Sequence, residues 1–90
     1  MPSEFPSQTD FFHAILRHLV EQSDGDLRRN IRDAMPDLLQ LSEEQRMERL
    51  PNTQVLRYRY RTGWGLTMLK SAGYIENPRQ GIWRVTESGR

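Results

Sequence analysis

The sequence contains no cysteine, so disulfides, thiol nucleophiles, iron–sulfur clusters and cysteine-based zinc sites are excluded. It also has only one lysine, Lys70. Leu69 precedes this lysine where a phosphate-binding P-loop needs glycine, and Met68 stands where an acidic-x-lysine nuclease site needs a carboxylate. His13 and His18 are five residues apart, so they do not stack on one helix face as paired metal ligands would. We therefore expect no catalytic site, no metal and no cofactor in this chain.

Long hydrophobic runs are absent too. No stretch approaches the roughly 18 consecutive apolar residues of a membrane span. Residues 1–6 lack the basic start and apolar run of a signal peptide. These absences predict a cytoplasmic protein with no membrane partner.

What the sequence does contain is an uneven distribution of charge. The 90 residues, enough for one domain, have a formal net charge of only +1. Residues 1–50 hold six arginines against ten acidic residues, a balance of −4, whereas residues 51–90 carry +5. Such asymmetry between two halves of a chain hints at contact with nucleic acid.

The first half of the chain is predicted to be helical. Residues 1–6 carry two prolines and predict a flexible lead-in. Ser7 followed by Asp10 predicts a capped helix over about 8–22. An amphipathic stripe over 27–39 predicts a second helix, in which Pro36 should cause a kink or a restart. Ser42 with Gln45 predicts a short third helix that reaches about residue 50.

The second half predicts a long helix over 54–72 and a hairpin. Two apolar stripes on this helix predict that it is packed on both sides, with Arg59, Gly63 and Lys70 in the window left open. Trp64 and Trp83 are both interpreted as core residues. Two β-prone runs, 74–76 and 82–85, flank a loop with proline and glycine at turn positions and predict a β-hairpin.

This order of elements predicts an α+β, mostly α fold. Specifically, it predicts a winged helix-turn-helix with three main helices, one short helix and a C-terminal β-hairpin wing, forming a single domain over 1–90. Residues 86–90 begin like another capped helix, so we expect an N-terminal domain of a longer protein. The basic half coincides with the long helix and the wing, the two elements that such a module offers to DNA.

Ten residues are candidates for DNA contact. Arginine suits this role because its planar fork pairs bidentately with phosphate or guanine. Arg57, Arg59 and Arg61 differ in wheel angle, so they cannot all face one groove, and Arg61 is the one expected to be structural. The alternative is that the neighbouring tyrosines are core residues and the arginines pair with the acidic half. The candidates are Asn52, Thr53 and Gln54 for base edges, Arg57, Arg59, Arg61 and Lys70 on the long helix, and Arg79, Gln80 and Arg84 in the wing.

Several stretches together resemble a known family. They are Arg61-Thr62-Gly63-Trp64-Gly65, Leu69-Lys70-Ser71-Ala72-Gly73-Tyr74-Ile75, Pro78-Arg79-Gln80-Gly81-Ile82-Trp83 and Thr86-Glu87-Ser88-Gly89. With the upstream Leu41–Arg46 run and Leu50-Pro51, they are similar to the N-terminal domain of Mrr-type restriction endonucleases. Two positions depart from the family pattern. Thr62 replaces an aliphatic residue, which should weaken the packing stripe, and Gln80 replaces a second basic residue in the wing.

The resemblance implies a winged-helix domain that binds double-stranded DNA, methylated DNA included. It also implies a separate nuclease domain that follows in the same chain and belongs to a restriction system. Two other readings stay open. One is a protein-interaction or dimerisation winged helix without DNA binding, for which a homodimer is the simplest form. The other is a stand-alone transcriptional regulator.

Overall fold

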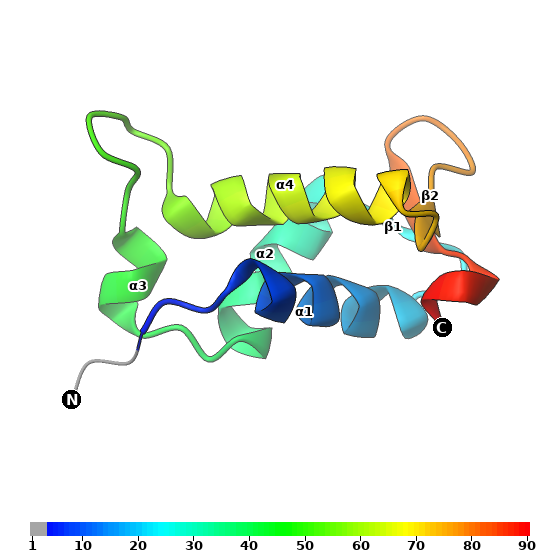
Figure 1. Ribbon diagram of the computed structural model, residues 1–90, viewed down its shortest axis with the longest axis horizontal. Coiled ribbons are helices and arrows are strands. Elements are labelled where there is room, and N and C mark those ends of the chain that lie inside the picture. Colours follow the sequence, from blue (N-terminus) through cyan, green and yellow to red (C-terminus); the bar gives the residue numbers. More distant parts are fainter. Residues whose placement is uncertain (1–3) are drawn as a thin grey trace.

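The computed structural model describes residues 4–90, whose backbone is mostly helical with one small antiparallel sheet (Figure 1). The α+β, mostly α class expected from the sequence is confirmed. In chain order, the elements are α1 (Gln8–Val20), β1 (Asp26–Leu27), α2 (Arg28–Leu38), α3 (Glu43–Met47), α4 (Arg57–Ser71), β2 (Ile75–Glu76), β3 (Ile82–Val85) and the 3-10 turn η1 (Glu87–Gly89).

Both predicted capping boxes are present. The Ser7 hydroxyl accepts a hydrogen bond from the Asp10 N–H, and the Asp10 carboxylate accepts one from the Ser7 N–H. Ser42 and Gln45 make the same reciprocal pair at the start of α3. Local side-chain chemistry therefore sets where these two helices begin.

Helix α2 differs from the prediction at both ends. Leu27 belongs to strand β1, which the sequence did not predict, because two residues are too few to show a period. At the other end the helix continues past Pro36 to Leu38, so no restart occurs. Pro36 lies in the last turn of α2. Its missing N–H removes one hydrogen bond close to the C-terminal end of the helix, so the helix is not interrupted.

Helix α4 begins at Arg57, three residues later than predicted. An isolated bridge joins Arg49 to Leu56, and the Leu50 N–H donates to the Val55 carbonyl at 2.9 Å. These bonds to residues before the loop keep Leu56 extended (ψ 133°), so residues 54–56 form the end of a loop instead of a first helical turn.

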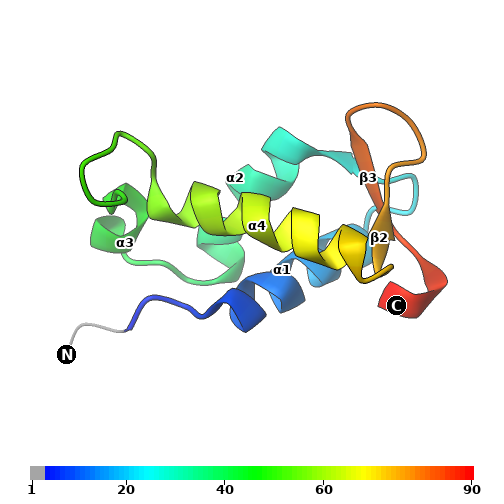
Figure 2. The same ribbon diagram turned by 45° about the horizontal axis from the view of Figure 1, so that its top comes forward.

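The core lies among α1, α2 and α4. Helices α1 and α4 lie side by side and run in the same direction, while α2 packs against both (Figures 1 and 2). The sheet has the order β1-β3-β2 and covers the end of the molecule where α4 stops. The fully buried apolar side chains include Phe11, Ile15, Leu19, Ile31, Met35 and Leu66.

Only one of the two apolar stripes predicted for α4 is buried. Tyr58, Gly65 and Leu69 lie in the core, but Tyr60 and Trp64 are 46% and 48% exposed. The prediction that α4 is packed on both sides is therefore wrong, and so is the core assignment of Trp64. The second stripe stays open because the sheet meets α4 only near the C-terminal end of that helix.

Trp83, on β3, and Thr62, on α4, both pack toward the interior of the domain. Trp83 packs against the buried cluster, as predicted. Thr62 is 1% exposed, and its hydroxyl donates to the Tyr58 carbonyl at 2.7 Å. The hydrogen bond satisfies the hydroxyl inside the core, which offsets the polar cost of replacing an aliphatic side chain.

The expected flexible lead-in of residues 1–6 falls partly outside the described residues, which begin at residue 4. Phe5 stacks on Phe11 with ring centroids 6.0 Å apart. The Pro6 carbonyl accepts a hydrogen bond from Arg61 at 3.3 Å, and the Glu4 carbonyl accepts one from Gln45 at 3.3 Å. Glu4 to Pro6 therefore lie against the starts of α1, α3 and α4.

Candidate nucleic-acid interface

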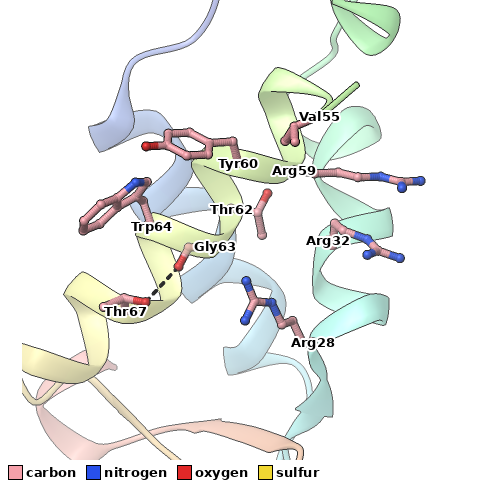
Figure 3. A pocket seen from close by; sticks show the side chains of 9 residues that line it. All are labelled: Arg28, Arg32, Val55, Arg59, Tyr60, Thr62, Gly63, Trp64 and Thr67. Atoms are coloured by element: carbon pink, nitrogen blue, oxygen red, sulfur yellow. Dashed lines mark hydrogen bonds between the residues drawn. The ribbon is translucent and has the colours of Figure 1, made fainter. Parts of the chain in front are cut away.

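An open groove of about 440 Å³ lies between α2 and α4 (Figure 3). Arginines of both helices and two aromatic rings of α4 share it, and the backbone at Gly63 lies between them. The lining residues are Arg28, Arg32, Val55, Arg59, Tyr60, Thr62, Gly63, Trp64 and Thr67.

Three arginines line this groove, of which Arg28 points its guanidinium toward Gly63 (Figure 3). Arg28 and Arg32 lie one turn apart on α2, and Arg59 faces them from α4. The Arg28 guanidinium lies so close to Gly63 that a Cβ at this glycine would be 2.7 Å from Nη2. Arg32 lies 3.4 Å from the Asp33 carboxylate, the one acidic group paired with this cluster among the described residues. The groove therefore carries a net positive charge.

Arg59 is exposed and has one polar partner among the described residues. Its Nε donates to the Tyr58 hydroxyl at 3.3 Å, and it forms no ion pair within residues 4–90. This hydrogen bond, the charge interaction with Tyr58 and the nearby Asp33 raise the pKa of Arg59 above its ordinary value. The guanidinium is exposed and fully charged at any physiological pH.

Tyr60 and Trp64 form the aromatic side of the groove. Their ring centroids are 6.5 Å apart at an interplanar angle of 70°, an edge-on arrangement. Tyr60 can therefore cover at most one face of the Trp64 indole. Figure 3 shows both rings projecting from α4 on the side of Gly63 that lies away from the arginines.

Four of the predicted contact residues are held by partners within the chain. The Thr53 hydroxyl donates to the Leu50 carbonyl at 3.0 Å and accepts from the Val55 N–H at 3.1 Å. Arg57 forms an ion pair with Glu48 at 2.5 Å and lies over the Phe5 ring at 4.3 Å. Arg61 donates to Pro6, which agrees with the structural role expected of it. Arg84 forms an ion pair with Glu76 across the β2–β3 pair. For Arg57, pairing with the acidic half of the chain is the alternative that the sequence left open, whereas Glu76, the partner of Arg84, lies in the basic half.

The other predicted residues and Thr53 are exposed and lie at the two ends of α4. Arg79 and Gln80 are in the loop 77–81 between β2 and β3, which we call the wing loop. Asn52, Thr53 and Gln54 are in the loop before α4, where Asn52 has a positive φ of 62°. In Figures 1 and 2 the two loops project to the same side of α4. Lys70 is exposed near the wing, with Nζ 5.8 Å from the centre of the Trp83 ring.

Sequence reasoning missed Arg28, Arg32 and Trp64 as site residues. The two arginines lie in the acidic half of the sequence, so counting charge by halves assigned them to the scaffold. One signal could have found them: Arg28 and Arg29 occupy the first turn of α2, where the helix dipole disfavours cations and no acidic residue is present. A local rule broken in this way often marks a functional surface.

The part of the chain that the structure describes, residues 4–90, contains neither a metal-ligand cluster nor a membrane span. No group of three or more histidine and acidic side chains gathers there as metal ligands would. No helix in this range is both long enough and apolar enough to cross a membrane.

The fold and the site together define a small, mostly helical α+β domain with a cationic, aromatic groove beside its longest helix. The chain belongs to the Mrr N-terminal domain family, whose family model matches residues 9–90. It is 31% identical over 84 residues to the type IV methyl-directed restriction enzyme EcoKMrr of Escherichia coli (strain K12). The match covers 93% of this chain but only 27% of that enzyme. No solved structure gives a significant match.

Proposed function

We propose that the chain is a winged helix-turn-helix domain that binds double-stranded DNA. In this proposal α4 is the recognition helix and the β2–β3 hairpin is the wing. The element order and the sheet order β1-β3-β2 support the assignment, although residues 39–56, with α3 among them, replace the usual tight turn between α2 and α4. The observation that carries the proposal is that Arg28, Arg32 and Arg59, from two different helices, line one groove.

The dimensions of α4 suit a duplex. Its 15 residues span about 22 Å at 1.5 Å per residue, and the major groove is about 12 Å wide and admits one helix. Gly63 carries no side chain between the arginines and the aromatic rings, and the Arg28 guanidinium occupies the space beside it, so a DNA phosphate in the groove would meet this cation. The loop before α4 and the wing loop would then contact the DNA at either end of the helix.

The structure revises which residues we assign to each role. Phosphate contacts fall to Arg28, Arg32, Arg59, Lys70 and Arg79, and base-edge contacts to Asn52, Thr53 and Gln54. Gln80 keeps a minor role at the wing tip. Arg57, Arg61 and Arg84 act mainly by holding the lead-in, α3 and the hairpin in place.

The relationship to a restriction enzyme extends the proposal to the whole protein. The relative is named as methyl-directed, and the match covers about a quarter of its length. We infer that the target DNA carries methylated bases, and that a nuclease domain elsewhere in the full-length protein cleaves it. A homodimer would let two such domains bind one site.

The test is the binding of a fluorescein-labelled duplex, methylated or unmethylated, measured by anisotropy across a salt series. Wild type should bind with an affinity that falls steeply with salt, by roughly 0.9 log units per log unit of salt for each phosphate neutralised. The double variant Arg59→Glu, Arg79→Glu should lose at least about tenfold in affinity and show a shallower slope. Arg17→Glu is the matched control, because Arg17 is an exposed arginine on α1 that lines a different hollow.

The result that defeats the proposal is wild type without salt-sensitive binding to any duplex. That outcome would favour the second candidate, a protein-interaction or dimerisation domain. The exposed stripe of Tyr60, Trp64 and Met68 supports this candidate, because it is the kind of apolar surface that a protein partner covers. Sedimentation of the chain at increasing concentration would then detect self-association.

A further inference from the structure

We propose that the groove between α2 and α4 binds an unpaired nucleobase, stacked on Trp64, together with its flanking phosphate. This inference rests on the proposed DNA binding and goes beyond it, because it names the part of the nucleic acid that the groove recognises.

The first step concerns Trp64. Its side chain is 48% exposed and belongs neither to the buried core nor to the side chains packed against it. Packing within the domain therefore does not explain its position. Tyr60 meets it edge-on, so at least one face of the indole is free of Tyr60. A flat, exposed aromatic face is the feature on which a nucleobase stacks.

The second step concerns the opposite side of the groove. Arg28 points toward Gly63 from the side opposite Trp64, whereas Arg32 and Arg59 line the same groove but point away from that glycine (Figure 3). Guanidinium groups bind phosphate bidentately. A ligand that uses both sides of the groove must join a planar ring to an anion within a short distance, and a nucleotide does so.

The third step excludes a paired base as the ligand. Within a duplex, both faces of each base are covered by neighbouring base pairs, so Trp64 can stack only on a base that has left the stack. The groove of about 440 Å³ lies within the roughly 300–1,000 Å³ range of small-ligand sites. The ligand is therefore an unstacked nucleotide. Either a single strand or a base extruded from a duplex can supply it.

The experiment compares three labelled probes: a perfect duplex, the same duplex with a one-base bulge, and the corresponding single strand. Wild type should bind the bulged duplex or the single strand more tightly than the perfect duplex. Trp64→Ala should weaken binding to the favoured probe by roughly 5- to 150-fold, the range expected when one base no longer stacks on an aromatic ring. Its affinity for the perfect duplex should change far less. Preference for the bulge identifies an extruded base as the source, and preference for the strand alone identifies single-stranded DNA.

Two variants and one spectroscopic readout separate stacking from a general apolar contact. Trp64→Phe should restore most of the preference because it restores a ring. Met68→Ala removes a 45% exposed apolar side chain from the same stripe, outside the groove, and should leave the preference unchanged. A 2-aminopurine placed in the bulge should lose fluorescence on binding to wild type but not to Trp64→Ala. Thermal melting should show that these exposed positions tolerate the substitutions.

The proposal is overturned if wild type binds all three probes equally and Trp64→Ala weakens each by the same factor. In that case DNA binding itself stands. If wild type binds none of the probes, both this inference and the proposed function fail.

Discussion

At the scale of single residues, Asp26 joins the start of α2 to α1. Its carboxylate accepts hydrogen bonds at 2.8 Å from the Leu27 N–H and the Asn30 amide, and it lies 2.8 Å from Nε2 of His18. Burial opposes ionisation of this carboxyl, but the hydrogen bonds from Asn30, His18 and Leu27 outweigh it and lower the pKa of Asp26.

The lowered pKa predicts how stability changes with acid. Asp26 titrates at a lower pH in the folded state than in the unfolded state, so its contribution is fully present above its ordinary value near 3.8. The contribution disappears as the pH falls through the folded pKa. Urea unfolding over a pH series should therefore show the free energy of unfolding of wild type falling below about pH 3.8 more steeply than that of Asp26→Asn. Parallel curves for the two proteins would mean that this carboxylate does not carry the effect.

At the scale of elements, α4 contains two glycines with different surroundings. A Cβ at Gly63 would meet only the end of the exposed Arg28 side chain, at 2.7 Å. A Cβ at Gly65 would lie 2.6 Å from Cδ1 of Ile15, a fully buried residue of α1 that packs in the core. Gly65 therefore permits the close approach of α1 and α4, whereas Gly63 does not have this role.

Alanine substitutions at these two positions should have opposite effects. Gly63→Ala should stabilise the protein by up to about 1 kcal/mol, because alanine is the better helix former. Gly65→Ala should destabilise it by about 1–3 kcal/mol through overpacking. Thermal or urea unfolding of the two variants checks both signs.

Gly63→Ala should also weaken DNA binding, since it displaces the Arg28 guanidinium from the groove. Stabilisation with unchanged affinity would argue against a role for Arg28 at that position.

The elements differ in how far the sequence could predict them. The starts of α1 and α3 were predictable because a serine and a side chain three residues later satisfy the first N–H groups locally. The start of α4 was not, because the bonds that hold residues 54–56 come from Arg49 and Leu50. Trp64 was misassigned for a related reason: a helical wheel shows which residues share a stripe but does not show whether another element covers that stripe.

At the scale of the whole molecule, folding redistributes the charge that the sequence presents as two halves. The count of −4 and +5 placed the binding surface in residues 51–90 alone. Packing of α2 against α4 adds Arg28 and Arg32 to that surface. Ion pairs with Glu48 and Glu76 engage Arg57 and Arg84, which the count had included. The candidate site could be only partly predicted because these exchanges depend on tertiary packing.

The salt dependence of binding distinguishes a surface formed by residues 51–90 alone from one that includes Arg28 and Arg32. If binding used only the basic half, neutralising arginines in residues 1–50 would leave the salt dependence unchanged. If the groove binds phosphate, the double variant Arg28→Gln, Arg32→Gln should flatten the slope of log affinity against log salt by about 0.9 for each phosphate that these arginines neutralise in wild type. Arg17→Gln removes a charge from the same half of the chain, away from the groove, and should keep the wild-type slope. Anisotropy titrations of the three proteins on one duplex give the three slopes. Equal slopes for all three would mean that residues 51–90 alone form the binding surface.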